Sequence, residues 1–107
     1  MIYLNGASLQ FESFPNGETR MPKITPWEIS DRCHIDFKYQ TDVDFLHLMF
    51  LKKKLDAMFA KNIQLAIWYM PYSRQDRVEG NSAFTLKYVC DFINSLNFET
   101  VTVYEPH

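Results

Sequence analysis

Hydrophobic and polar positions follow a strand-like order at the start of the chain. Residues 2–4 (IYL) are apolar and are followed by Asn5-Gly6, a dipeptide typical of tight turns. Residues 8–14 (SLQFESF) then place apolar and polar side chains at alternate positions, with the period of two that a half-buried strand shows. This order predicts two short strands that are joined by a turn.

Proline and glycine interrupt this pattern from residue 15 onward. The segment 15–18 (PNGE) predicts a turn, because proline restricts its own φ and Asn-Gly favours positive φ. Residues 19–32 contain two further prolines and show no hydrophobic period. We therefore predict an irregular loop there, with room for a short strand at Trp27–Ile29.

The next part of the chain changes from a strand pattern to a helix pattern. The segment 34–40 (HIDFKYQ) alternates strictly and predicts a half-exposed or edge strand. After Thr41 and Asp42, both suited to cap a helix, apolar residues recur about every 3.6 positions. This period predicts a helix that continues to about Asn62.

A strand, a helix and a strand complete the chain. The segment 63–70 (IQLAIWYM) has the length and apolar character of a buried strand. Ser82 is suited to cap a second helix, which we predict to end near Asn97. The segment 100–105 (TVTVYE) predicts a last strand. The short connections indicate an α/β fold with a parallel-rich sheet and flanking helices. Two helices are too few to cover both faces of such a sheet, so we expect apolar surface to remain for another domain or subunit.

Composition narrows the class of protein. The chain has 107 residues, enough for one domain, and its 47% hydrophobic content excludes a disordered chain. The net charge of −2 argues against a nucleic-acid-binding surface. The lysine run at 52–54 fits the solvent-exposed face of a helix. Cys33 and Cys90 lack the spacing of a zinc site or a disulfide framework. Without a secretion signal or a membrane-length apolar run, we expect a cytoplasmic protein that does not bind membranes.

The polar loop after residues 63–70 carries the candidate chemistry. It contains Arg74, Gln75, Asp76 and Arg77, directly after a predicted buried strand. Ligands of open α/β sheets bind at the carboxyl ends of the strands, where a guanidinium, an amide and a carboxylate can hold a heterocycle or phosphate oxygens. From the residues alone, an equally good interpretation is that these side chains solvate a turn and pair with one another.

Three segments of the chain form a set: 14–18 (FPNGE), 71–77 (PYSRQDR) and 103–107 (VYEPH). All three resemble motifs of the ribose-phosphate pyrophosphokinases, or phosphoribosyl pyrophosphate synthetases. The first resembles the family's phenylalanine-x-asparagine/aspartate-x-glutamate motif, and the second its proline-tyrosine-alanine-arginine-glutamine-aspartate-lysine/arginine motif. The third resembles the strand end at which an acidic residue precedes a histidine by two positions. The resemblance extends from about Phe11 to the end and is closest to divergent, phage-like members. It implies that residues 1–107 are the N-terminal domain of such an enzyme, of the phosphoribosyltransferase-like type, without its C-terminal catalytic half.

The resemblance implies an activity and a set of ATP contacts. Enzymes of this family transfer the β,γ-diphosphoryl group of ATP to ribose 5-phosphate, with Mg²⁺, and form phosphoribosyl pyrophosphate and AMP. Six residues match positions that contact ATP in the family, the first three by reaching the adenine from a neighbouring subunit: Phe14, Asn16, Glu18, Arg74, Gln75 and Asp76. The resemblance therefore implies a homo-oligomer with a shared site.

The last residues match the family's catalytic and metal positions. His107 matches a histidine near the triphosphate and Mg²⁺, where an imidazole can stabilise charge that develops during transfer, and Glu105 and His107 match metal-linked positions. Glu105 replaces the family's usual aspartate, and the family's helix after the first strand is missing. The ribose-phosphate-binding loop is also missing, so the 107 residues alone are expected to be inactive and to bind ATP at about millimolar strength at best.

Two other interpretations stay open. A non-catalytic subunit associated with a phosphoribosyl pyrophosphate synthetase would keep the fold and the oligomer contacts, and a dimerisation module would consist of this segment alone. Several side chains are interpreted as structural: His34 and His47 as surface or partly buried residues, and Trp68 and Tyr69 as core. Tyr72 is interpreted first as packing under the polar loop and second as a ligand contact, and Asp42 and Asp44 are explained by an N-cap and by favourable placement in the helix dipole.

Overall fold

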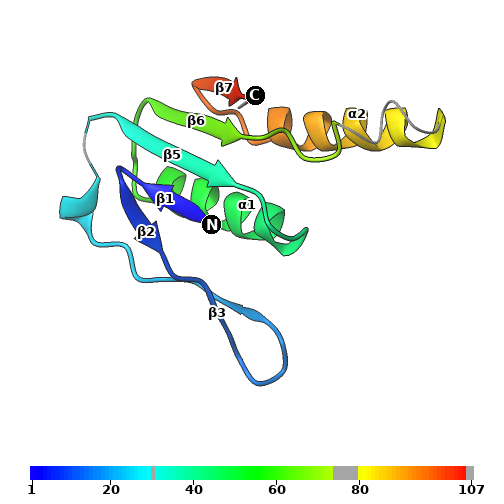
Figure 1. Ribbon diagram of the computed structural model, residues 1–107. Helices are drawn as coiled ribbons and strands as arrows, with labels where there is room; N and C mark the ends of the chain where they lie inside the picture. The colour runs from blue at the N-terminus through cyan, green and yellow to red at the C-terminus, as the bar shows by residue number, and fades with distance from the viewer. Residues whose placement is uncertain (30, 74–79, 106–107) are drawn as a thin grey trace.

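The computed structural model describes residues 1–29, 31–73 and 80–105, with side chains described outside 80–84. The elements are, in chain order, β1 (Ile2–Leu4), β2 (Ala7–Leu9), β3 (Glu12–Ser13), β4 (Thr19–Arg20), the 3₁₀ turn η1 (Pro26–Glu28), β5 (Cys33–Lys38), α1 (Val43–Ala57), β6 (Ile63–Trp68), α2 (Gly80–Ser95) and β7 (Thr100–Tyr104). Within the described residues, five strands form one sheet in the order β2-β1-β5-β6-β7, and β3 and β4 form a separate ribbon (Figure 1). The protein is thus a mixed α/β domain.

The sheet is parallel in one half and antiparallel in the other. Strand β6 pairs in parallel with both β5 and β7, and Trp68 lies opposite Lys38 on one side and Tyr104 on the other. Strand β1 pairs antiparallel with β5 and with β2. The predicted order of strand, helix, strand, helix and strand after residue 34 is confirmed, and the sheet is parallel over these three strands.

Both helices cover the same face of the sheet. The crossovers run from β5 to β6 and from β6 to β7, so right-handed connections place α1 and α2 on one side, and Figure 1 shows α1 behind the strands. The core lies between this face and α1, where Ile35, Phe37 and Leu65 meet Leu48 and Leu51 with 0–1% of their surface exposed. Over the described residues, the opposite face carries no helix, as the small number of helices predicted.

The position of β5 decides between the two alternatives for this segment. Strand β5 lies between β1 and β6 in the sheet, so an edge strand is wrong. Its side chains alternate between the two faces, with Cys33, Ile35 and Phe37 buried and His34 and Lys38 exposed. This alternation confirms the half-exposed interpretation. Strand β5 is not an edge strand, because the antiparallel strand β1 pairs with its otherwise free side.

The N-terminal region differs from its predicted strands. Residues 8–14 do not form one strand but end β2 at Leu9 and continue in β3, and 19–20, predicted as loop, pair with β3 as β4. Trp27–Ile29 is not a strand, because η1 occupies Pro26–Glu28. The Glu28 carboxylate accepts a hydrogen bond from the Thr25 backbone N–H at 3.1 Å, and this local bond stabilises the turn.

Helix α1 ends five residues before the predicted position. Phe59 adopts a φ of 62°, and the N–H of Ala60 donates to the Leu55 carbonyl at 3.0 Å, which is a Schellman-type helix end. This left-handed residue prevents the helix from reaching Asn62. The predicted cap of the second helix is also wrong, because the backbone is already helical at Gly80, two residues before Ser82.

One lysine of the run at 52–54, Lys52, is buried and does not lie on the solvent-exposed face of the helix. Lys52 is only 5% exposed, whereas Lys53 and Lys54 are exposed. The Lys52 ammonium donates to both carboxylate oxygens of Asp56 at 2.8 Å and lies 5.7 Å from the centre of the Phe98 ring. The carboxylate one helical turn away compensates the burial of this charge.

None of the described helices has the length and apolar character that crossing a membrane requires.

Candidate functional site

The carboxyl ends of β5, β6 and β7 meet at one edge of the sheet, because these strands are parallel. The segment after β6 and Glu105 after β7 are therefore neighbours, and the N–H of Tyr69 donates to the Tyr104 carbonyl at 2.9 Å. This is the edge at which open α/β sheets bind ligands. Glu105 is exposed there, while the other predicted residues of this edge, Arg74, Gln75, Asp76 and His107, lie outside the described residues.

A hollow of about 650 Å³ opens at this edge. Its walls come from the end of β5 and from the segment after β6, and they are formed by Lys38, Tyr39, Trp68, Tyr69, Met70, Pro71, Tyr72 and Ser73. Trp68 and Tyr69, predicted as core, are 40% and 45% exposed. That prediction is wrong because Trp68 lies on the face of the sheet that no described helix covers. A hollow of this volume has the size of a small-molecule site.

The wall of this hollow includes a tight turn with unusual backbone geometry. The N–H of Ser73 donates to the Met70 carbonyl at 3.4 Å, and Pro71 and Tyr72 occupy the two central positions. Tyr72 has a φ of 69°, the sign that a type II turn requires after proline, and Tyr69 has a φ of 74°. Bulky side chains rarely adopt positive φ, and such backbone strain is concentrated at functional sites.

Asp42 connects this turn to the start of α1. One of its carboxylate oxygens, Oδ1, accepts the hydroxyl hydrogens of both Tyr39, at 2.5 Å, and Tyr72, at 2.6 Å. The bonds from Tyr39 and then Tyr72 hold the pKa of Asp42 below its usual value, and the bond to Asp42 raises the pKa of both phenols. Tyr72 packs against Tyr39, since the two rings lie 6.2 Å apart, but the loop under which it was predicted to pack lies outside the described residues.

The two aspartates at the start of α1 have different roles. Asp42 occupies the cap position, but its side chain makes no capping bond to the helix. Asp44, which is 9% exposed, accepts the backbone N–H groups of Gln40 at 2.8 Å and Thr41 at 3.1 Å through Oδ2. The predicted cap position of Asp42 is therefore confirmed, but its carboxylate is engaged by the tyrosine hydroxyls and makes no capping bond. Asp44 lies in the first turn of the helix and orders the segment before it.

The second predicted motif forms the tip of the β3–β4 hairpin. The Asn16 amide donates to the Glu18 carboxylate at 2.6 Å, and the N–H of Glu18 donates back to the Asn16 side-chain oxygen at 3.0 Å. Phe14 is 47% exposed and lies 5.9 Å from the Arg20 guanidinium. The hairpin projects from the sheet, away from the carboxyl ends of β6 and β7 (Figure 1). The structure thus groups Phe14, Asn16 and Glu18 but does not bring them to the Glu105 edge of the same chain.

The base of the hairpin is attached to α1 by one ring contact. The Phe11 ring stacks on the His47 imidazole with centroids 4.2 Å apart and planes 3° from parallel. Burial is the largest influence on His47 and holds its pKa below the usual value. The interpretation of His47 as a partly buried packing residue is confirmed, because the imidazole is half-buried beneath Phe11.

The described part of the edge offers one donor for a metal ion. Among the described residues, no three histidine, cysteine, aspartate or glutamate side chains form a group that could hold one. Mg²⁺ in phosphate-transfer sites takes one or two protein carboxylates together with substrate phosphates and water, so the chemistry of Glu105 suits this ion.

Comparisons with protein-family models, with curated proteins and with solved structures found no match.

Sequence reasoning did not find the residues that line the hollow from the end of β5. The alternation at 34–40 predicts a strand but not that Lys38 and Tyr39 line a hollow, and the apolar run at 63–70 predicts Trp68 as core. A signal was present in the register: Lys38, Trp68 and Tyr104 end three successive parallel strands, so their side chains lie in one row. Sheet order, which a single sequence does not specify, was needed to use this signal.

Proposed function

We propose that this chain is the ATP-binding part of a ribose-phosphate diphosphokinase, in a domain of the phosphoribosyltransferase-like type. The observation that supports this most directly is the parallel pairing of β6 with β7. It brings the start of the motif at 71–77 and the segment that begins at Glu105 to one edge of the sheet. The proposal requires this, because both segments contact the same nucleotide.

In this proposal the strand-end segments have separate tasks. Arg74, Gln75 and Asp76 bind ATP, the guanidinium packing on the adenine plane, while Glu105 and His107 serve the metal and the phosphate groups. Mg²⁺, when bound, neutralises phosphate charge during the transfer. The turn at Met70–Ser73, fixed by Tyr72 and its bond to Asp42, sets the direction in which the chain enters the ATP-binding segment.

A second copy of the chain completes the proposed site. Phe14, Asn16 and Glu18 project on a hairpin tip that lies away from the Glu105 edge of their own chain (Figure 1). On the hairpin tip of a neighbouring subunit, the exposed aromatic ring can stack on adenine. The amide and the carboxylate can accept hydrogen bonds from the exocyclic amine of adenine. We therefore propose a cytoplasmic homo-oligomer whose subunits share the ATP site.

The test is AMP release from ATP with Mg²⁺, measured with and without ribose 5-phosphate. It uses the complete gene product, because the proposal assigns the ribose-phosphate site to a sequence beyond these residues. We expect AMP only with the sugar phosphate, and a decrease of at least 100-fold in Arg74→Ala, since positioning supplies most of such catalysis. Lys61→Ala, which removes an exposed positive charge just before β6, is the control and should retain full activity.

The opposite result separates the remaining candidates. If the folded gene product released no AMP in response to ribose 5-phosphate, the diphosphokinase would be excluded. A non-catalytic subunit associated with such an enzyme, or a dimerisation module, would then be the better interpretation.

A further inference from the structure

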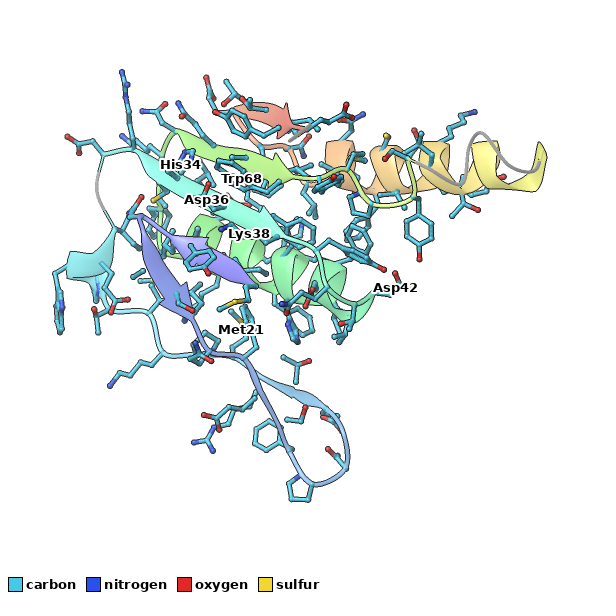
Figure 2. All side chains as sticks on the ribbon, in the orientation of Figure 1. Met21, His34, Asp36, Lys38, Asp42 and Trp68 are labelled. Carbon is cyan, nitrogen blue, oxygen red and sulfur yellow. The ribbon has the colours of Figure 1, made fainter. Side chains whose placement is uncertain are left out.

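A surface at the carboxyl ends of β6 and β7 is made of two stacked, partly exposed aromatic rings. The rings of Trp68 and Tyr104 stack with centroids 4.6 Å apart and planes 23° from parallel, and they are 40% and 44% exposed. The indole N–H of Trp68 donates to Asp36 Oδ1 at 2.8 Å, which fixes the orientation of the ring. Figure 2 shows Trp68, Asp36 and Lys38 together on the open face of the sheet. This surface is therefore ordered before any ligand arrives, which lowers the entropic cost of binding.

A positive charge lies at the edge of this surface. The Lys38 ammonium is 5.2 Å from the centre of the Tyr3 ring and 5.6 Å from that of Trp68. Among the described residues, no carboxylate forms an ion pair with it. The two nearest carboxylates along the chain are engaged elsewhere, Asp36 with Trp68 and His34, and Asp42 with two phenols. Lys38 thus remains available to a negatively charged group.

The hollow next to Lys38 has the properties of a ligand site. Its volume of about 650 Å³ exceeds that of a two-ring aromatic compound, and no aspartate or glutamate is among the described residues that line it. The aromatic residues Tyr39, Trp68, Tyr69 and Tyr72 are among those that line it. Predominantly aromatic walls with one placed charge are typical of sites that bind small planar molecules.

We propose that this hollow binds a small planar aromatic anion. The flat ring of the ligand packs against Trp68, and its negative group lies at the Lys38 ammonium. An aromatic carboxylate and a nucleoside monophosphate both have this chemistry. The inference goes beyond the proposed diphosphokinase, because Lys38 and Trp68, the residues that carry it, are not among the ATP contacts assigned by resemblance.

The experiment observes the indole N–H of Trp68 by NMR. The chain has two tryptophans, and Trp27 is 82% exposed, so a Trp27→Phe background leaves Trp68 as the sole indole reporter. Three probes are titrated without Mg²⁺: 2-naphthoate, the uncharged 2-naphthamide, and AMP. We expect a saturable shift of the Trp68 resonance with 2-naphthoate, and about tenfold weaker binding of 2-naphthamide, since one charge-assisted contact is worth about a factor of ten.

Variants of Lys38 test the role of the charge. Lys38→Met should remove the tenfold preference for the anion, Lys38→Arg should retain it, and Lys61→Met, before β6, should leave it unchanged. Equal affinity for both naphthyl compounds, or an anion preference that persists in Lys38→Met, would overturn the proposal. Given the anion preference, tighter binding of 2-naphthoate than of AMP indicates an aromatic carboxylate, and tighter binding of AMP indicates a nucleotide; both results support the site. These outcomes do not depend on AMP release, so the two proposals can fail separately.

Discussion

At the scale of single residues, six non-glycine residues in the described part of the chain adopt positive φ, and they divide into two chemical groups. Three are asparagines, Asn5, Asn62 and Asn97, which tolerate this region because their short polar side chains bond locally. The other three are aromatic: Phe59, Tyr69 and Tyr72. Both tyrosines line the hollow at the sheet edge, where the strain accompanies a shaped wall, whereas Phe59 is 87% exposed at the end of α1.

Phe59→Gly should stabilise the protein by about 1 kcal/mol. The substitution removes the cost of a left-handed non-glycine residue, about 1–2 kcal/mol, less the extra entropy that glycine loses on folding. Almost no side-chain packing is lost, because Phe59 is 87% exposed. Urea unfolding monitored by circular dichroism measures the change. Phe59→Ala serves as the control and should give little of this gain, since alanine also disfavours positive φ. A less stable Phe59→Gly protein would contradict the expectation.

At the scale of elements, the Asp42 carboxylate joins three segments that are separate in sequence. Tyr39 follows β5, Asp42 precedes α1, and Tyr72 belongs to the turn after β6. Two hydroxyl donors favour the ionised form of Asp42, and Asp42 in turn favours the neutral form of both phenols. The arrangement therefore responds to pH from both sides.

Asp42→Asn should reduce stability at neutral pH and lose its effect at both extremes. The lowered pKa of Asp42 contributes stability above the usual carboxyl pKa of about 4, and this contribution disappears as the pH falls through the folded value. The raised pKa of Tyr39 contributes stability below the usual phenol value of 10.0, and this is lost as the pH rises past the folded value.

The measurement is the urea midpoint of both proteins between pH 3 and pH 11. We expect the largest difference between about pH 5 and pH 9. Phenol absorbance provides a second measurement: tyrosine ionisation should begin at lower pH in Asp42→Asn, where no carboxylate opposes it. A difference in midpoint that is the same at every pH would show that the charge of Asp42 contributes nothing.

At the scale of the whole molecule, one layer of helices covers one face of a sheet. The radius of gyration is 14.5 Å, whereas about 13 Å is typical of a chain of this length. The excess reflects parts that project from the sheet, the β3–β4 hairpin and the start of α2 (Figure 1). Such a shape leaves surface uncovered, which agrees with the proposal of a second subunit at the hairpin tip.

Substitutions on the two faces of β5 should differ strongly in cost. Phe37→Ala should destabilise the protein by about 3–5 kcal/mol, because this ring is 0% exposed between the sheet and α1 and leaves a cavity. His34→Ala, on the open face of the same strand, should change stability by no more than about 0.5 kcal/mol. Urea unfolding of both variants gives the comparison. Similar losses for the two would mean that the open face is also packed in solution.

Part of the fold, in both halves of the sheet, is predictable from local patterns. The alternation of Ile35 and Phe37, the apolar run that begins at Ile63 and the turn at Asn5-Gly6 all have their cause within a few residues, so they were predicted at close to their observed positions. The helix end at Phe59 was not predictable, because aromatic residues do not usually take the left-handed conformation that ends a helix.

The sequence by itself determined the order of strands and helices after residue 34 and the motifs that suggest a nucleotide site, because periodicity and motif spacing are local properties of the chain. Only the tertiary structure decided the rest. The pairing of β1 with β5 made central a strand that the sequence predicts as half-exposed or edge, and the parallel register placed Lys38, Trp68 and Tyr104 in one row. Contacts between residues 30 or more positions apart, such as Tyr72 with Asp42, depend on which elements pack together, and a local pattern does not encode that choice.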